Sequence, residues 1–438
     1  MAFLLFRRKW RFVKFLVFVI VVVVTFYGGY FYGTNKVSVS WKNFRPISKV
    51  ESMQAPAIEN LDMDLLYQTL DSLNKDYYDK TKLDSTKILY GAVSGVLASL
   101  DDPYTSFFPP ARNEAFKEQL AGEFSGIGAE LTLNKDKLIS VIAPLEESPA
   151  QKAGIKPGDI IIKVEGKETI GWSLADAVAK IRGKKGTPVK LTIIHENEDT
   201  PKEVTIVRDT IVVKSVRGWV ERLSCEKNMC KRAAKDCTNC PSVAYIRLSQ
   251  FGDKTNQEWT DEVNKLFPQF SAEKNFKGII LDVRSNPGGY LNDAVYIASE
   301  FIEDGLIVAQ EDGNGNREEL NVNRKGVLGK YPLIVLVDGG SASASEIVSG
   351  ALKDRKGAKI MGEHSFGKGT VQSAIDVTGG GSIHMTIAKW LTPNGTWVHQ
   401  KGIEPDIKVS LDASKSATMQ SDGGYDNQID AAIRELIK

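Results

Sequence analysis

The hydrophobic positions of the chain change their spacing along its length, and each change predicts a different element. Residues 15–33 form an uncharged run of 19 positions, which is long enough to cross a bilayer as a helix. Residues 61–100 repeat apolar positions at helical spacing. One face of these predicted helices carries Leu65, Leu66, Leu70 and Leu73. That face is expected to pack in a core or in a dimer contact, and the sequence favours the core.

Three later segments have the pattern of strands. Gly278–Val283 and Tyr331–Asp338 are short apolar runs rich in branched residues, as in buried strands, and Thr370–Val377 alternates. The helices Tyr290–Ile302 and Ala344–Asp354 are predicted to follow the first two. An α/β core containing the strands around Ile279, Leu333 and Val371 is therefore expected.

The turn before the second helix carries a candidate nucleophile. Ser341, Ser343 and Ser345 alternate with alanine there, and free backbone N–H groups at a helix start can face an oxyanion. Ser343 with Glu346 is also typical of a capping box. The pattern alone does not choose among the three serines.

A lysine boxed between glycines is the candidate base for this serine. Lys368 lies between Gly367 and Gly369, and burial can lower a lysine pKa so that the neutral amine accepts a proton. Period-two geometry would put Lys368 and Gln372 on one face, where Gln372 could orient the amine. The alternative is a surface turn with a solvated ammonium.

A third segment, Arg284–Gly289, is a tight loop after the first strand. Paired glycines there can present outward N–H groups as an anion nest. Asn286-Pro-Gly-Gly is equally a turn signal with no chemistry attached.

These three segments, in this order, resemble the carboxyl-terminal processing peptidases, or tail-specific proteases, which are serine–lysine enzymes. The resemblance covers the chain from about Leu61 to its end and includes the segments 98–107, 390–395 and 402–406. It implies an α/β core of ClpP/crotonase type, with Ser343 as nucleophile, Lys368 as general base and Gln372 as the residue that orients the lysine. It also implies an oxyanion hole made by Ala344 with Gly288 or Gly289. Asp354 is a weaker acidic candidate and is expected to be structural.

The β-rich segment from 122 to 208 resembles a PDZ domain. Ser125–Leu131 matches its carboxylate-binding loop, and Ser148–Ile161 contains its downstream turn. Free N–H groups at Ile127 and Gly128 could receive a terminal carboxylate beside a groove where a peptide adds as a strand. Arg182, at the end of the predicted helix of this domain, is a candidate for gating the protease core, or else a solvated cation favoured by the helix dipole.

Charge assigns an orientation to the apolar run and excludes one class of partner. The net charge of +1 gives no reason to expect nucleic acid. A basic flank from Arg7 to Lys14 precedes the run and belongs on the cytoplasmic side. A cleaved signal peptide is the competing interpretation, but the aromatic end of the run favours an uncleaved anchor. The catalytic part is then expected outside the cytoplasm, in the periplasm or at the cell exterior.

Four cysteines cluster in a polar stretch that departs from the family pattern. They are Cys225, Cys230, Cys237 and Cys240. Outside the cytoplasm an even number favours two disulfides, with three pairings open. Zinc is the main alternative and free thiols the third, and no cofactor is expected.

The four histidines offer no rival site. His364 lies four residues before Lys368, while His195, His384 and His399 have no evident serine partner in the sequence. The His-Glu-x-x-His spacing of metalloproteases is absent from the sequence.

The expected organisation has six parts. They are a basic flank and transmembrane anchor at 1–34, a linker at 35–60, helices at 61–121, a PDZ domain at 122–208, a protease core at 209–412 with the cysteine insertion at 222–241, and a C-terminal linker and helix at 413–438. The expected function is that of a membrane-anchored serine endopeptidase of the bacterial cell envelope that recognises protein C-termini. A homodimer and an activating adaptor are partners left open. A catalytically silent PDZ scaffold that binds protein tails is the alternative.

Overall fold

The computed structural model describes residues 18–27, 37–42, 45–50, 63–145, 147–195, 198, 200–226, 229–233, 237, 239–412 and 426–438. The chain divides into two compact units, Met1–Ser85 and Thr86–Lys438. In the first unit residues 18–27 are helical. The predicted linker at 35–60 contains an antiparallel hairpin of β1 (Val37–Lys42) and β2 (Arg45–Val50). α2 (Asp64–Asp76) and the 3-10 turn η1 (Lys80–Lys82) follow.

The predicted membrane span at 15–33 lies partly outside the described residues, and the predicted linker before the last helix, at 413–425, lies wholly outside them. Among the helices that are described, none combines the length and the apolar character needed to cross a membrane. α2 and α3 (Ser85–Ala98) confirm the predicted helices, but neither contains a buried residue. The prediction that Leu65 and Leu66 pack in a core is therefore wrong, because these residues are 71% and 37% exposed.

The second unit contains the predicted β-rich domain. Its sheet has the order β10-β9-β7-β6-β5, with β8 paired to β7, while β11 pairs with β4. The elements are β4 (Glu123–Gly126), β5 (Ala129–Leu133), β6 (Ile139–Pro144), α5 (Pro149–Lys152), β7 (Ile160–Val164), β8 (Lys167–Glu168), α6 (Leu174–Ile181), β9 (Pro188–Ile194), β10 (Lys202–Val207) and β11 (Asp209–Val212). Ser173 caps α6 in a capping box with Asp176. The helix predicted just before Arg182 is confirmed as α6.

The α/β core is built on a sheet of order β13-β12-β14-β15-β18-β19-β22. From β14 to β22 the neighbours are parallel, whereas β12 is antiparallel to both β13 and β14. These strands are β12 (Val216–Glu226), β13 (Met229–Arg232), β14 (Ser242–Leu248), β15 (Phe276–Asp282), β18 (Leu333–Val337), β19 (Lys359–Gly362) and β22 (Ile407–Lys408). The core helices are α7 (Thr255–Ser271), α8 (Leu291–Ala298), α9 (Ala344–Ala351) with the π-helical turn η2 (Leu352–Lys356), and α11 (Asn427–Ile437).

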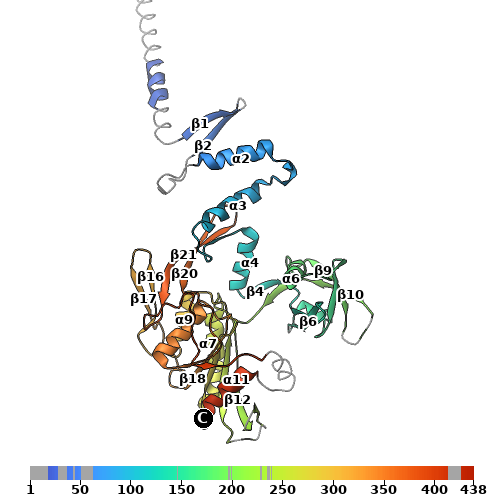
Figure 1. Cartoon of the computed structure of the whole chain (residues 1–438), viewed down its shortest axis with the longest axis vertical. Coiled ribbons are helices and arrows are strands. Elements are labelled where there is room, and N and C mark those ends of the chain that lie inside the picture. The colour runs from blue at the N-terminus through green and yellow to red at the C-terminus, as the bar shows by residue number, and fades with distance from the viewer. Residues whose placement is uncertain are drawn as a thin grey trace, which may run out of the picture. The chain divides into compact units, whose positions relative to one another are not determined.

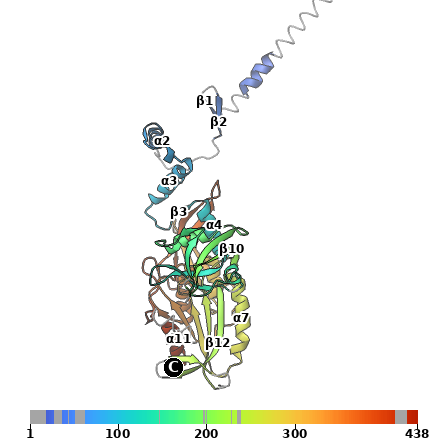
Figure 2. The ribbon, with the colours of Figure 1, turned by 90° about the vertical axis from the view of Figure 1, so that its right-hand side faces the viewer.

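Alternate residues of the central strands face different hydrophobic clusters. Ile279 and Leu281 of β15 belong to the cluster that includes α7, α8 and α9, whereas Ile280 belongs to the cluster that includes α11. Since successive strand residues point to opposite faces, the sheet is covered by helices on both sides. α7 runs along β12 (Figures 1 and 2), whereas α11 packs against the central strands β15 and β18.

A second sheet has the order β17-β16-β21-β20, and β3 pairs with β21. Its strands are β3 (Ser106–Phe108), β16 (Leu306–Asp312), β17 (Arg317–Asn321), β20 (Thr370–Asp376) and β21 (Ser382–Leu391), and α4 (Pro110–Leu120) follows β3. Val371 therefore lies outside the sheet of Ile279 and Leu333, contrary to prediction, although it packs against the same hydrophobic cluster. A register shift between Val371 and Gln372 also interrupts the expected alternation of this strand.

Candidate active site

Ser343 occupies a strained turn between β18 and the start of α9. Its backbone has φ 54° and ψ −114°, a combination that residues with a side chain rarely adopt. Strain of this kind is stored at functional sites and is typical of a nucleophile presented at a sharp strand-to-helix turn. An ordinary N-cap has extended backbone angles, so capping alone does not account for this conformation.

The two neighbouring serines have structural roles. Ser341 is fully buried, and its hydroxyl donates to the Val283 carbonyl at 2.8 Å. Ser345 is also fully buried, and its hydroxyl donates to the Asn286 carbonyl at 2.9 Å. Ser343 is partly exposed. Accessibility therefore distinguishes the three serines, which the sequence pattern does not.

Glu346 joins the serine turn to the lysine segment. Its Oε2 accepts from the backbone N–H of Ser343 and from that of Lys368, at 2.9 Å in each case. Its Oε1 accepts from the Ser365 hydroxyl and from the Gly367 N–H, both at 2.6 Å. The carboxylate is fully buried, so these four donors replace the water it would otherwise bind. Glu346 was predicted only as a capping residue, because its other partners are distant in sequence.

Lys368 lies in a half-buried position against residues from the N-terminal side of the core. Its ammonium is 5.3 Å from the centroid of the Tyr104 ring, and its carbonyl accepts from Trp390 Nε1 at 2.9 Å. Burial lowers the pKa of Lys368, while the charges of Asp102 and Glu346 oppose that shift. A lowered pKa is what a lysine base requires. No hydrogen bond joins the amine to Ser343 or to Gln372 among the described residues.

The predicted oxyanion residues differ in their placement. A Cβ built on Gly288 would lie 2.9 Å from Ser343 Cβ and 3.0 Å from Ala344 N, so only glycine fits against the serine turn. The same test at Gly289 meets the Phe251 carbonyl oxygen at 1.7 Å instead. Ala344 begins α9, where N–H groups lack intrahelical acceptors. The Gly288 N–H donates to Asn286 Oδ1 at 2.9 Å, so in this arrangement it is already occupied.

The chain also matches two family models and several known proteins. The family model for peptidase family S41 matches residues 242–409, and the PDZ domain model matches residues 119–194. The carboxy-terminal processing protease CtpA of Bacillus subtilis is 38% identical over 364 residues, which cover 83% of this chain and 72% of that protein. CtpB of the same organism is 35% identical over 376 residues, covering 84% and 73%.

The chain belongs to the carboxy-terminal processing proteases of peptidase family S41. It is accordingly a serine-type peptidase with a PDZ domain, as predicted. A solved structure of a putative S41 protease from Bacteroides fragilis is 16% identical with a TM-score of 0.53, covering 78% of this chain and 89% of that one. That likeness concerns the fold alone.

The PDZ groove of this processing protease lies between β5 and α6. β5 is the last strand in its sheet order, so its outer edge can accept an added peptide strand. A cleft of about 250 Å³ is lined by Ile127, Gly128, Leu131, Val178 and Arg182, among others. Gly128 has φ +72°, and a Cβ there would meet Ser148 Cβ at 2.5 Å. The predicted carboxylate-binding residues therefore line the groove.

Arg182 contacts the PDZ domain itself. Its guanidinium carbon lies 4.7 Å from the centroid of the Phe124 ring on β4, and the residue lines the peptide groove. Arg182 therefore packs on β4 and not on the protease core, where the gating contact was predicted. β4 is paired with β11 at the boundary of the domain.

Gln372 and Asp354 have other partners. The Gln372 amide donates to Thr370 Oγ1 at 2.8 Å and to Thr386 Oγ1 at 3.2 Å. Its predicted role, to orient the Lys368 amine, is therefore not supported by a direct hydrogen bond among the described residues. Asp354 accepts from Thr392 Oγ1 and from the Asn394 N–H. It fixes a turn, as expected of a structural residue.

His364, His195 and His384 have partners other than Ser343 and Lys368. His364 lies 3.3 Å from Glu404, and His195 lies 2.7 Å from Asp159. His384 does have a serine neighbour, Ser382, at 3.1 Å, which the sequence did not reveal. Ser382 is 1% exposed and is therefore closed to a substrate.

All four cysteines of this protease are paired. Cys225 bonds to Cys230, and Cys237 bonds to Cys240. This outcome confirms the favoured interpretation of the cluster and selects one of the three pairings that the sequence left open. Cys225 and Cys230 are also cross-strand partners in the β12–β13 hairpin.

Proposed function

We propose that this chain is a membrane-anchored serine endopeptidase that captures protein C-termini in its PDZ groove and cleaves peptide bonds with Ser343 and Lys368. One observation supports the assignment most strongly. Glu346 Oε2 accepts from the backbone N–H groups of both residues, so the strained serine turn and the lysine segment form one unit. The names of the relatives, carboxy-terminal processing proteases, agree with substrates that are cut near a C-terminus.

The chemistry follows from these roles. The neutral Lys368 amine removes the proton from Ser343 as the hydroxyl attacks the substrate carbonyl. The Ala344 N–H faces the oxyanion that develops, and a backbone amide of the Gly288–Gly289 pair is the second donor. The protonated lysine then gives its proton to the leaving amine, and water releases the acyl group with Lys368 again acting as base.

The arrangement described here requires movement before that attack. The Lys368 ammonium faces Tyr104 and must turn toward Ser343. The Gly288 N–H must leave Asn286 Oδ1 if it is to bind the oxyanion. Gln372 would orient the turned amine through Thr370 and Thr386, since its amide already bonds both hydroxyls.

The anchor rests on the sequence of residues 15–33, which is uncharged and follows a basic flank. With the flank in the cytoplasm, the protease part would lie in the periplasm or at the cell exterior, where disulfides such as Cys225–Cys230 persist. Extraction of membranes at alkaline pH should leave the full chain in the pellet, and recovery in the supernatant would contradict the anchor.

The partners and the core type are also proposals. α2 and α3 expose apolar side chains, among them Leu65, Leu89 and Val96, and a homodimer would cover them. Leu65→Glu with Leu89→Glu should then lower the mass measured by light scattering. An adaptor would act on the PDZ side. The parallel strands β14 to β22, with helices on both faces, support a ClpP/crotonase-type core.

A peptide cleavage assay separates the protease from a silent PDZ scaffold. Wild type should cleave a peptide with a free C-terminus, and Ser343→Ala and Lys368→Ala should each abolish cleavage. His364→Ala, in the same segment as the lysine, is the matched control and should retain most of the activity. Binding without cleavage by wild type would favour the scaffold, and equal loss in folded His364→Ala would overturn the assignment of the base.

A further inference from the structure

A buried arginine ties the C-terminal helix to the loop that carries the oxyanion glycines. Arg284 Nη1 donates to Gln428 Oε1 at 2.6 Å, and its Nη2 donates to Asp426 at 2.9 Å. Asp426 caps α11 and Gln428 lies in its first turn. Arg284 is 8% exposed and Gln428 is fully buried. These contacts join residues 142 and 144 positions apart in the sequence.

The same arginine is also held by Asp282, at the end of the central strand β15. Asp282, at the end of β15, accepts from Arg284 Nε and Nη2 and from Arg247 and Tyr245. Burial alone would raise the pKa of Asp282, but its hydrogen bonds and charge interaction with Arg284 hold that pKa below the ordinary value. Arg284 is therefore held between Asp282 on one side and Asp426 and Gln428 of α11 on the other. We call this arrangement the clamp.

The loop after Arg284 is locked to the serine turn. Ser285 donates through its N–H and its hydroxyl to Asp338, at 2.6 and 2.9 Å. The Asn286 carbonyl accepts from the Ala342 N–H at 3.0 Å and from the Ser345 hydroxyl at 2.9 Å. A displacement of Arg284 would therefore reach Gly288 and the residues around Ser343 through direct hydrogen bonds.

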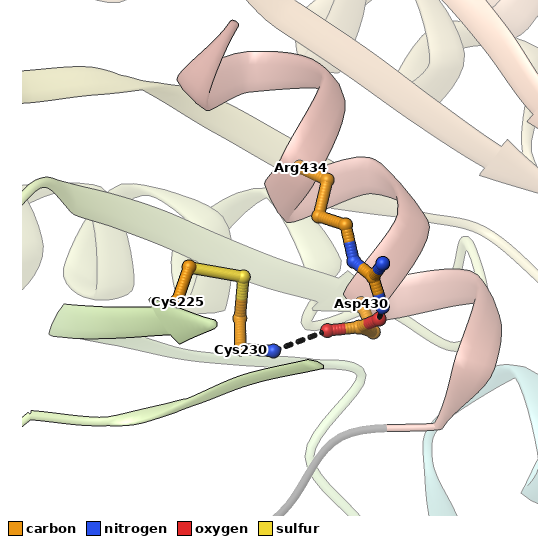
Figure 3. Close-up of a disulfide and its surroundings, with 4 residues drawn as sticks. All are labelled: Cys225, Cys230, Asp430 and Arg434. Carbon is orange, nitrogen blue, oxygen red and sulfur yellow. Dashed lines mark hydrogen bonds and ion pairs between the residues drawn. A yellow bond between two sulfur atoms is a disulfide. The ribbon is translucent and has the colours of Figure 1, made fainter. Parts of the chain in front are cut away.

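A disulfide-bonded cysteine also contacts the first turn of the same helix. The Cys230 N–H donates to Asp430 Oδ1 at 2.7 Å, and Arg434 pairs with the other carboxylate oxygen of Asp430 (Figure 3). Cys230 is buried in the cluster that contains Ala432 and Ile433, whereas Cys225 is exposed. The Cys225–Cys230 bond closes the β12–β13 hairpin at this contact.

We propose that α11 is a positioning element of the active site, holding the oxyanion loop through Arg284, and that the Cys225–Cys230 disulfide maintains catalysis by fixing this helix. Reduction of the disulfide from its exposed end would loosen the hairpin under α11 and weaken the grip on Arg284. The proposal rests on the proposed roles of Ser343 and Gly288. It adds to them positioning residues, Asp426 and Gln428, that touch no substrate.

Substitutions on α11 test the clamp. Gln428→Leu removes the acceptor from Arg284, whereas Gln428→Glu keeps an acceptor oxygen. Asp426→Asn keeps a cap for the helix and removes the charge. Because the oxyanion loop acts mainly on the transition state, Gln428→Leu should lower kcat about tenfold with KM nearly unchanged. Gln428→Glu should restore part of the rate, because it keeps the acceptor oxygen for Arg284 but loses the amide that donates to the Val409 carbonyl. Glu435→Gln, at the other end of α11 and paired with Lys359, is the control and should not change kcat.

Reduction tests the disulfide. In a Cys237→Ala/Cys240→Ala background, dithiothreitol breaks only the Cys225–Cys230 bond, giving two thiols and cyclic oxidised dithiothreitol. The value of kcat should fall about threefold or more and return on reoxidation. Cys225→Ala/Cys230→Ala should show the same loss with no response to dithiothreitol.

The outcomes distinguish the clamp from the nucleophile assignment. If folded Asp426→Asn and Gln428→Leu and the reduced protein all keep the wild-type kcat while Ser343→Ala is inactive, the clamp is wrong and the nucleophile stands. If Ser343→Ala is active, the proposed function itself fails. If Gln428→Leu does not fold, Asp426→Asn and reversible reduction decide the question by the same kcat criterion.

Discussion

The backbone N–H groups of Ser343 and Lys368 donate to the same oxygen atom, Glu346 Oε2, each at 2.9 Å. The proposed nucleophile and the proposed base are therefore held by one buried carboxylate, although they lie in different loops. The other oxygen, Oε1, accepts from the Ser365 hydroxyl and the Gly367 N–H. The position of the backbone from Ser365 to Lys368 therefore depends on the Glu346 side chain.

Removal of this carboxylate should affect stability and catalysis together. Glu346→Ala leaves four donors without their acceptor, two of them in buried contacts, which should lower the free energy of unfolding by about 2–4 kcal/mol. It should also lower kcat at least tenfold, because the lysine segment loses its fixed distance from the serine turn. Thermal unfolding and peptide cleavage measure the two effects. Glu318→Ala, at an exposed site on β17, is the control, and a wild-type kcat in Glu346→Ala would contradict this role.

The pH dependence of cleavage should report Lys368. The neutral amine is the working form, and burial lowers its pKa, so kcat/KM should rise with pH and reach its plateau below the ordinary lysine pKa of about 10.4. The charge of Asp102 raises the pKa of Lys368. Asp102→Asn should therefore move the rising limb to lower pH. A flat profile from about pH 5 to 9, or a shift to higher pH, would count against this assignment.

Features that depend on local spacing were predictable from the sequence. The strand before Ser343, the helix after it and the glycines around Lys368 could be predicted because their signals lie within a few residues. The second role of Glu346 could not, because its partners lie 19 to 22 residues away. Tyr104 and Asp102 meet Lys368 only through the tertiary fold. The bulge after Val371 could not be predicted from the alternation of residues in this strand, because the register is set by pairing with the neighbouring strand β21.

Asp293 should lower stability at neutral pH. Burial raises the pKa of Asp293 to about 6, above the unfolded value of about 3.9. The folded state thus favours the protonated acid, and stability is lost as the pH rises from about 4 through 6. Asp293→Asn keeps an acceptor for Asn256, whose amide donates to Asp293 at 2.8 Å. The variant should be more stable than wild type by about 1 kcal/mol at pH 7 and equal to it below pH 4.

Denaturant titrations at several pH values measure this difference. An Asp293→Asn variant that is less stable at pH 7, or a difference that grows as the pH falls, would show that the carboxylate is favourable in the folded state.

Arg182 should couple peptide binding to cleavage from within the PDZ groove. A tail peptide with a free carboxylate should raise the cleavage rate of a separate reporter peptide more than its amidated form does. Arg182→Ala should reduce that stimulation, because the arginine packs on Phe124 and lines the groove. Lys180→Ala is the control. Lys180 lies in α6, and its ammonium faces the Trp172 ring. Equal stimulation in wild type and Arg182→Ala would end the gating hypothesis.

The acyl-enzyme gives the most direct test of the central claim, that Ser343 is the nucleophile and Lys368 its base. An activated ester that acylates quickly and deacylates slowly should add its acyl group to the peptide containing residues 341–345, and fragmentation should place it on Ser343. The same treatment of Lys368→Ala should give almost no adduct. An adduct on Ser341 or Ser345, or an undiminished adduct in folded Lys368→Ala, would contradict the assignment.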